Sequence, residues 1–237
     1  MTEQDIDSAR NAHKALAARR AVEFVHDGQV VGLGTGSTAA FAITELGLLV
    51  SQGMRVRGVP TSKSTELLAR KCGIPLVELN ELCKVDVTID GADEIDPGFD
   101  MIKGGGGALS REKFVAIVSD LEIIIVDPPK LVPVLGQTVP VPVEVLQFGW
   151  CLPASRLREL GCIPNLRQRD GQPFESDNGN YILDCSFGPI TDPAGLEKAI
   201  KQIPGVVESG VFVGLADRLI VGSDQGIEVR DRAVSTA

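Results

Sequence analysis

The chain has 237 residues, enough for one large domain or two unequal ones. Hydrophobic residues make up 43% of it and charged residues 23%, which is typical of a folded globular protein and not of a disordered chain. The net charge of -9 and the lack of any block rich in lysine and arginine argue against a nucleic-acid-binding protein, because phosphate binding needs a clustered basic face.

The N-terminal part alternates between helical and strand patterns. Residues 8–25, rich in Ala, Arg and Lys, have apolar residues at near-helical spacing and predict an amphipathic helix. A β-type run at 29–33, a glycine turn at 34–37 and a helical pattern at 38–49 follow. This is the order of an α/β unit.

The same alternation continues up to residue 126. The further elements predicted are a strand at 56–59, a helix at 65–71, strands at 76–79 and 85–89, a helix at 109–119 and a strand at 122–126. The last is an apolar, β-branched run that suits a buried parallel strand. The pattern predicts a doubly wound, mostly parallel, Rossmann-like α/β domain.

Five prolines, at 128, 129, 133, 140 and 142, then interrupt regular structure and indicate a crossing between domains. Beyond them the pattern predicts β-α-β-β-α-β, at 141–145, 154–160, 163–168, 180–185, 194–202 and 206–213. This order is typical of a small ferredoxin-like α+β domain. Strands at 218–222 and 226–230 are expected to return to the first sheet. The predicted domains are therefore 1–132 with 214–237, and 133–213.

The segment GLGTGST at 32–38 is the first motif that can carry chemistry. Its glycines allow a sharp turn, and the N–H groups at the following helix start, with Thr and Ser hydroxyls, suit a phosphate. The spacing is G-x-G-x-G, not the G-x-G-x-x-G of dinucleotide sites, and no Walker lysine follows. Anion binding, nucleotide binding and a purely structural turn all stay open for this motif alone.

A hydroxyl-rich segment, TSKST at 61–65, follows the strand predicted at 56–59. Such a cluster can simply cap the next helix. It can also border a ligand site, because ligands of doubly wound sheets gather beyond the carboxyl ends of the strands.

Three carboxylates, Asp90, Asp93 and Glu94, follow the strand predicted at 85–89. Closely spaced carboxylates suit groups that hold or donate protons near neutral pH. A metal site and a solvated acidic turn are the alternatives. The only histidines, His13 and His26, lie elsewhere in the sequence, which argues against a transition metal, but an all-carboxylate Mg²⁺ site stays open.

Four consecutive glycines, 104–107, stand between Lys103 and a predicted helix that carries Glu112. A glycine run is costly to order and exposes backbone N–H groups, so an oxyanion-binding nest is its natural use. Glu112 alone is more typical of a surface helix, and the neighbouring motifs reverse that expectation. Lys14 and Lys130, each typical of a solvated surface if taken alone, can approach the same edge of the sheet.

The N-terminus and the cysteines bear on localisation. The first residues are acidic and lack the layout of a secretory signal. The most apolar stretches, such as 121–126, are too short to span a bilayer. Reduced thiols are expected for the five scattered cysteines, Cys72, Cys83, Cys151, Cys162 and Cys185. We therefore expect a cytoplasmic protein with no membrane partner.

Four segments together closely resemble the ribose 5-phosphate isomerase A family, namely GLGTGSTA at 32–39, TSKST at 61–65, DGADEID at 90–96 and KGGGGALSREK at 103–113. Their order and spacing agree with the family, and echoes at 140–145, 177–180 and 203–206 extend the resemblance over almost the whole chain. It implies that the protein interconverts D-ribose 5-phosphate and D-ribulose 5-phosphate through an enediol(ate), in the non-oxidative pentose phosphate pathway. It also implies no metal or organic cofactor, and a homodimer or homotetramer.

The resemblance further implies roles for single residues. Glu112 is the base that moves a proton between C2 and C1, Asp90 and Asp93 handle hydroxyl protons, and Lys103 with the glycine nest steadies the enediolate. Glu94 is expected to be secondary. Gly107 stands where some members have alanine, and this difference is expected to be harmless. The implied substrate-binding residues are Thr35, Gly36, Ser37, Thr38, Asp90, Gly91, Ala92, Asp93, Lys103, Gly104, Gly105, Gly106, Lys130 and Lys14.

Two other functions stay open. A non-catalytic sugar-phosphate-sensing domain would not need Glu112 as a base, and a sensor that regulates transcription would carry a basic helix-turn-helix segment. A transferase that uses an acyl carrier or a nucleotide is favoured only by the glycine turn. The residue types favour the isomerase, because an aldose–ketose shift needs one mobile carboxylate base and a site that favours a developing oxyanion.

Overall fold

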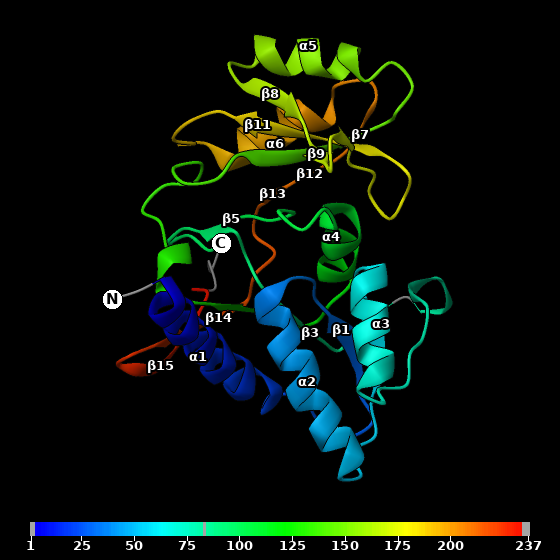
Figure 1. Cartoon of the computed structure of the whole chain (residues 1–237), viewed down its shortest axis with the longest axis vertical. Coiled ribbons are helices and arrows are strands. Elements are labelled where there is room, and N and C mark those ends of the chain that lie inside the picture. The colour runs from blue at the N-terminus through cyan, green and yellow to red at the C-terminus, as the bar shows by residue number, and fades with distance from the viewer. Residues whose placement is uncertain (1–2, 83, 234–237) are drawn as a thin grey trace. The chain divides into compact units, whose positions relative to one another are not determined.

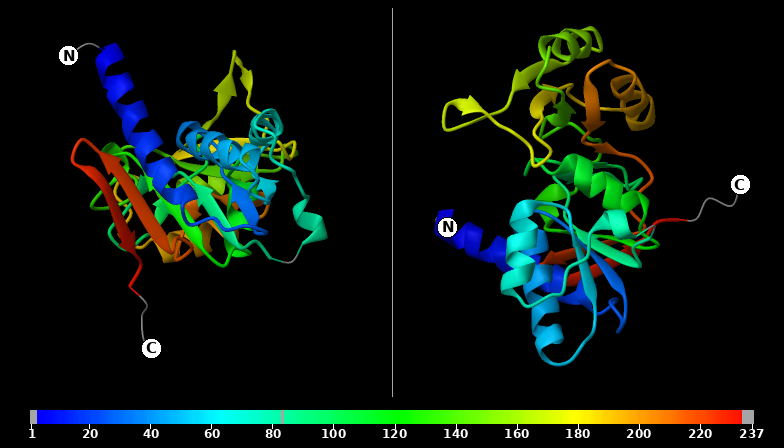
Figure 2. Two further views of the ribbon diagram at one scale, coloured as in Figure 1. Left: turned by 90° about the horizontal axis from the view of Figure 1, so that it is seen from below. Right: turned by 90° about the vertical axis from the view of Figure 1, so that its right-hand side faces the viewer.

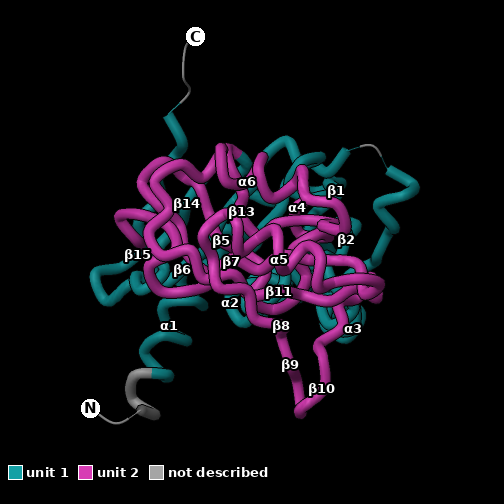
Figure 3. Tube along the Cα trace, turned by 90° about the horizontal axis from the view of Figure 1, so that it is seen from above, with its two compact units in different colours: residues 1–92, 114–131, 215–237 teal, residues 93–113, 132–214 magenta. Residues whose placement is uncertain are grey.

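The computed structural model describes residues 3–82 and 84–233, and the chain forms two compact units (Figure 3). Unit 1 consists of Met1–Ala92, Phe114–Leu131 and Leu215–Ala237, and unit 2 of Asp93–Lys113 and Val132–Gly214. This division differs from the predicted domains mainly at residues 93–113, which belong to unit 2. The reason is that two short strands in this segment pair with each other, and one of them also pairs with a third strand of unit 2.

Unit 1 is built on a six-stranded sheet in the order β15-β14-β6-β3-β1-β2. Its elements are α1 (Glu3–Val22), β1 (Val30–Leu33), α2 (Ser37–Ser51), β2 (Arg57–Pro60), α3 (Lys63–Lys71), the 3-10 helix η1 (Leu79–Glu81), β3 (Val87–Asp90), β6 (Glu122–Val126), the 3-10 helix η2 (Pro128–Lys130), β14 (Arg218–Ser223) and β15 (Gly226–Asp231). All neighbouring strands are parallel except β14 and β15.

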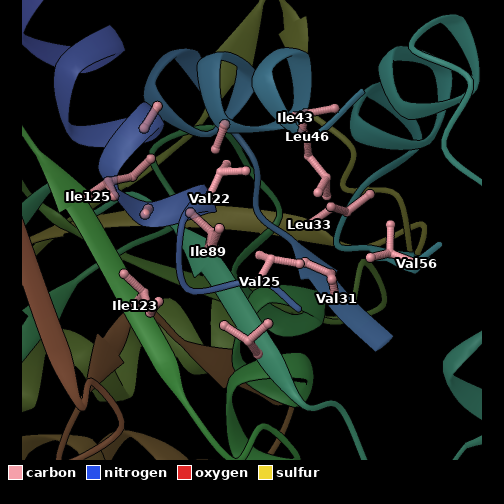
Figure 4. Packing of buried hydrophobic residues seen from close by; sticks show 14 of the residues in the cluster. Val22, Val25, Val31, Leu33, Ile43, Leu46, Val56, Ile89, Ile123 and Ile125 are labelled. Carbon is pink, nitrogen blue, oxygen red and sulfur yellow. The ribbon is translucent and has the colours of Figure 1, made fainter. Parts of the chain in front are cut away.

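Alternating strand residues face the two sides of this sheet. On one side, Val31, Ile89 and Ile125 pack against α1 and α2, which lie along this face (Figures 1 and 4). On the other side, Val30 packs against Val115, near the end of α4 (Leu109–Ile117). Because helices cover both faces of a largely parallel sheet, the predicted doubly wound α/β fold is confirmed.

The strand predicted at 76–79 is wrong. Only Leu76 pairs with a neighbour, as an isolated bridge to Gly58, and the chain then turns into η1. The apolar residues there instead pack at the margin of a core, where Val77 and Leu79 contact the cluster around Val30. The predicted return of the last two strands to the first sheet is confirmed by β14 and β15.

Unit 2 contains a four-stranded antiparallel sheet in the order β12-β7-β11-β8. Its elements, besides the start of α4, are β4 (Glu94–Ile95), β5 (Met101–Ile102), β7 (Val141–Val145), α5 (Cys151–Glu159), β8 (Ile163–Leu166), β9 (Gln168–Arg169), β10 (Gln172–Pro173), β11 (Tyr181–Ser186), α6 (Pro193–Lys201), β12 (Val206–Ser209) and β13 (Val211–Phe212). Chain order and strand order agree with the predicted ferredoxin-like arrangement. The β9–β10 hairpin projects from the rest of the unit (Figure 2).

The alternating side chains of β7 lie in two different environments. Val141, Val143 and Val145 are buried in the apolar core together with Leu157 of α5 and Ile200 of α6. The alternate residue Glu144 is fully buried as well, but its carboxylate is surrounded by hydrogen-bond donors. Glu144 therefore lies in a buried polar environment, in contrast to the valines on either side of it.

Four cysteines, Cys72, Cys151, Cys162 and Cys185, are free thiols, and Cys83 lies outside the described residues. Within 3–82 and 84–233, no helix is both long enough and apolar enough to cross a membrane.

Candidate active site

Strands β1 and β3 lie side by side at the point where the strand order of the unit 1 sheet reverses. In doubly wound sheets, ligands bind outside the carboxyl ends of the strands at this point. The glycine turn leaves β1 there, and Asp90 ends β3. The Gly34 N–H donates to the Ile89 carbonyl at 3.0 Å, and the Thr35 N–H donates to Asp90 Oδ1 at 3.1 Å.

Gly34 is required by the close approach of Asp90. A Cβ atom on Gly34 would lie 2.2 Å from Asp90 Oδ1 and 2.6 Å from Asp90 Cα, which no rotamer change can relieve. Asp90 is buried, and its Oδ1 also accepts the Gly91 N–H at 2.7 Å. The two motifs that the sequence places 55 residues apart are thus one assembly.

The hydroxyl segment at 61–65 braces the glycine turn. Thr35 Oγ1 lies 2.8 Å from Thr61 Oγ1 and 2.9 Å from Ser62 Oγ, and Thr65 Oγ1 donates to the Gly34 carbonyl at 2.8 Å. Ser62 also caps α3 by accepting the Thr65 N–H at 3.0 Å. The capping interpretation is therefore correct, and the same cluster holds the Thr35 side chain.

A lysine lies at the start of α2, the helix that follows the turn. Lys14 Nζ donates to Ser37 Oγ at 3.0 Å. The helix begins at Ser37, so its first N–H groups and the Lys14 ammonium lie together and suit an anion. Lys130, half-buried, ends η2 just after β6, the strand next to β3.

The central pair of unit 2 is Lys103 with Glu112, which lies in the first turn of α4. Lys103 Nζ is 3.3 Å from Glu112 Oε1, and the two side chains are only 2% and 5% exposed. Taking two charges out of water costs several kcal/mol per ion, and pairing offsets that cost only in part. A pair buried to this degree is therefore a candidate for chemistry more than for stability.

The glycine run after Lys103 forms a turn beside Asp93. The Gly107 N–H donates to the Gly104 carbonyl at 2.9 Å, and the Gly105 N–H donates to Asp93 Oδ2 at 2.7 Å. Gly105 and Gly106 are exposed. The loop thus places two exposed glycines beside one carboxylate, which the Gly105 N–H holds.

The third carboxylate of the acidic loop has a different task. Glu94 is fully buried and accepts the N–H groups of Gly136, Thr138 and Val139 at 2.5, 2.5 and 3.1 Å, and the Thr138 hydroxyl at 2.6 Å. These hydrogen bonds hold the loop at residues 136–139 of unit 2 in place. Across residues 3–82 and 84–233, no three His, Cys, Asp or Glu side chains are placed as ligands of one metal ion.

Two further buried polar residues, Lys113 and Glu144, fix α4 to the rest of unit 2, and sequence reasoning missed both. Lys113 Nζ contacts Glu208 at 3.1 Å, Glu197 at 2.6 Å and the Val211 carbonyl at 2.7 Å. Burial alone raises the pKa of Glu208, but the Lys113 ammonium and hydrogen bonds from Lys201 and the Ser209 N–H lower this pKa on balance.

Glu144 holds the other side of α4. Its carboxylate accepts hydrogen bonds from Ser110 at the helix start, from Ser176 at 2.6 Å and from Asn180 at 2.9 Å. The only sequence signal was an acidic residue inside the apolar run VPVEV.

Gly107 is restricted by its backbone conformation and by a neighbouring aromatic ring. Its φ is +89°, and a Cβ atom there would lie 2.5 Å from the Phe174 ring. Both the backbone and the aromatic neighbour oppose a side chain at this position, so it favours glycine over alanine.

We accordingly expect Gly107→Ala to lower the free energy of unfolding by about 1–3 kcal/mol, as measured by urea titration. Gly171→Ala is the matched control, because Gly171 has φ +76° and no atom within 4 Å of the added Cβ. Equal losses in the two variants would exclude the Phe174 contact as a cause.

A model of the family described as ribose 5-phosphate isomerase A (phosphoriboisomerase A) matches residues 57–226. The chain is 58% identical over 217 residues to ribose-5-phosphate isomerase A of Gloeobacter violaceus, covering 91% of this chain and 94% of that one. It is 49% identical over 222 residues to the protein of the same name from Thermomicrobium roseum, covering 93% and 94%.

Solved structures of ribose-5-phosphate isomerases are also similar to this chain. A D-ribose-5-phosphate isomerase in complex with phospho-erythronic acid has a TM-score of 0.90 and 38% identity, covering 98% of this chain and 100% of that chain. Ribose 5-phosphate isomerase from Plasmodium falciparum has a TM-score of 0.90 and 40% identity, covering 93% and 98%.

Proposed function

We propose that this chain, which belongs to the ribose 5-phosphate isomerase A family and is an aldose–ketose isomerase, interconverts D-ribose 5-phosphate and D-ribulose 5-phosphate through an enediolate. Glu112 is the base that carries the proton between C2 and C1. The observation that supports this assignment best is the buried pair of Glu112 with Lys103, the residue just before the glycine run.

The proton steps follow from the residue types. The Glu112 carboxylate takes the C2 proton of the open-chain aldose, and the electrons move into the C1–C2 bond and onto the C1 oxygen. That oxygen is then protonated, the C2 hydroxyl loses its proton to become the ketone, and Glu112 returns a proton to C1. Asp90 and Asp93 transfer the hydroxyl protons.

The negative charge of the intermediate needs donors that are in position beforehand. The Lys103 ammonium and the N–H groups of the glycine run, Gly104 to Gly106, fill this role. Support comes from the turn that the run forms and from the hydrogen bond that holds Asp93 to Gly105. Gly91 and Ala92 contact the substrate through their backbone.

The phosphate is bound at the start of α2. We assign it to the backbone and hydroxyl groups of Thr35, Gly36, Ser37 and Thr38 together with Lys14, whose ammonium contacts Ser37. Lys130 is a second cation for the same group. Helix N-termini and lysine ammonium groups both bind phosphates.

Replacing Lys14 by methionine should therefore raise the KM for ribose 5-phosphate about tenfold, the loss of one charged contact of roughly 1–2 kcal/mol, with little change in kcat. Lys71→Met, at the exposed end of α3, is the control and should leave both constants unchanged. A lower kcat with an unchanged KM would contradict a role in phosphate binding.

We infer that the enzyme acts in the cytoplasm, in the non-oxidative pentose phosphate pathway, without metal or organic cofactor and without a nucleic-acid partner. A homodimer or homotetramer is also proposed. Unit 2 supports it with exposed apolar side chains on and around α5, where Phe148 is 95% and Ile163 is 68% exposed.

An isomerisation assay in the presence of EDTA tests the function directly. We expect ribose 5-phosphate to be converted to ribulose 5-phosphate at the same rate with and without the chelator. Loss of turnover in EDTA would contradict metal-free catalysis. Binding of ribose 5-phosphate without any turnover would instead favour the non-catalytic sensing domain.

A further inference from the structure

Arg167, between β8 and β9, reaches the glycine run with its guanidinium. Its Nη1 donates to the Gly104 carbonyl at 3.0 Å and to the Gly105 carbonyl at 3.1 Å. The other side of the guanidinium is fixed by Asp184 of β11, with Nε to Oδ2 at 2.9 Å and Nη2 to Oδ1 at 2.5 Å. This two-pronged ion pair leaves the guanidinium one orientation.

These contacts set the direction of two peptide groups. In a trans peptide, the C=O of one residue and the N–H of the next point in opposite directions. With the Gly104 carbonyl on Arg167, the Gly105 N–H points away from it, and this N–H is the one that donates to Asp93. With the Gly105 carbonyl on Arg167, the Gly106 N–H also points away, at an exposed residue.

Arg167 therefore fixes which polar groups of the glycine run point toward it and which point away. Carbonyl oxygens face the guanidinium, and amide hydrogens face the side on which Asp93 lies. Glycine peptides rotate easily because glycine populates positive and negative φ alike. Without the guanidinium, a rotated peptide would present a carbonyl oxygen to a developing oxyanion and would repel it.

We propose that Arg167 is a positioning residue of the isomerase, which orients the glycine-run amides and Asp93 for stabilisation of the enediolate and is itself oriented by Asp184. The proposal rests on the proposed function, in which these amides face the intermediate. It assigns Arg167 no contact with the substrate. Its effect is therefore confined to steps in which negative charge develops.

Arg169 provides a matched comparison. Both arginines lie over the Phe174 ring, at 5.8 Å for Arg167 and 4.4 Å for Arg169, and they are two residues apart. Arg169 is exposed and belongs to the projecting hairpin. A general effect of hairpin packing or of positive charge should therefore appear in both arginines, and an effect on the glycine run only in Arg167.

The test compares Arg167→Gln, Arg167→Lys, Asp184→Asn and Arg169→Gln with the parent. For each we would measure kcat, KM, melting temperature, inhibition by inorganic phosphate, and the Kd of phospho-erythronic acid, whose carboxylate carries a charge like that of the enediolate. Parent activity is the first readout, because its absence would refute the proposed function and not this role of Arg167.

In Arg167→Gln we expect kcat to fall about 10²-fold, as when one oxyanion donor is lost, with KM within about threefold. Binding of phospho-erythronic acid should weaken while inhibition by inorganic phosphate stays unchanged. Arg167→Lys and Asp184→Asn should lie between this variant and the parent, and Arg169→Gln should equal the parent.

An unchanged kcat in Arg167→Gln would overturn the proposal, as would equal losses of affinity for inorganic phosphate and phospho-erythronic acid. If Arg167→Gln does not fold, Asp184→Asn decides, because it keeps the arginine and loosens only its orientation. Parent-like kcat and parent-like binding of phospho-erythronic acid in Asp184→Asn would then refute the role.

Discussion

Replacing Glu112 by glutamine should remove most of the turnover, with kcat lower by about 10²–10⁴-fold, the usual contribution of a general base. Glutamine has the same shape but cannot accept the C2 proton. The KM for ribose 5-phosphate should change little, because the phosphate contacts proposed for Lys14 and α2 are untouched. Steady-state rates and substrate titration measure the two effects separately.

A second readout isolates the carbon proton. The parent, incubated with ribulose 5-phosphate in deuterium oxide, should incorporate solvent deuterium at C1, because a carboxylate exchanges its proton with water between steps. Glu112→Gln should not. Glu159→Gln, at an exposed glutamate of α5, is the control and should behave as the parent. Full activity or full exchange in Glu112→Gln would refute the base assignment.

Stability must be separated from chemistry in this variant. Neutralising Glu112 breaks its buried ion pair with Lys103, and removing one partner of a buried pair costs roughly 3–5 kcal/mol. The double variant Lys103→Met with Glu112→Gln removes both charges, so it should regain much of that stability and stay inactive. Recovery of activity in the double variant would contradict the proposed roles of both residues.

Strands were predicted best where an apolar, β-branched run is bounded by residues that end regular structure. The strands expected at 122–126 and 141–145 coincide with β6 and β7, because apolar β-branched runs there are bounded by acidic residues or prolines. The strand expected at 76–79 failed because its apolar residues pack beside a sheet without pairing along it. β4 and β5, two residues each, are too short for any periodicity to indicate them.

The site was predictable as a set of residues but not as a set of contacts. Glycine, hydroxyl and carboxylate motifs identify themselves locally, and so Asp90, Asp93 and Glu94 looked like one acidic cluster. Their partners are set by chain segments far away, since Thr35 lies 55 residues from Asp90 and Thr138 lies 44 residues from Glu94. No local pattern indicates such pairings, and the positions of Glu144 and Arg167 were hidden for the same reason.

Because Glu94 holds a loop of unit 2 through hydrogen bonds, replacing it should have a large effect on stability. Glu94→Ala should lower the free energy of unfolding of unit 2 by roughly 2–4 kcal/mol. This is less than the sum of four charged hydrogen bonds at about 1.5–3 kcal/mol each, because Gly136, Thr138 and Val139 lie near the surface and water replaces part of the bonding.

The only tryptophan, Trp150, belongs to unit 2, so its fluorescence during urea unfolding reports on this part of the chain. Asp93→Asn is the control from the same loop. It should unfold close to the parent midpoint but lose turnover, whereas Glu94→Ala should unfold earlier and retain most of its turnover at low temperature, where it remains folded. If Glu94→Ala kept the parent midpoint and lost turnover, Glu94 would belong with Asp93 among the proton-handling carboxylates.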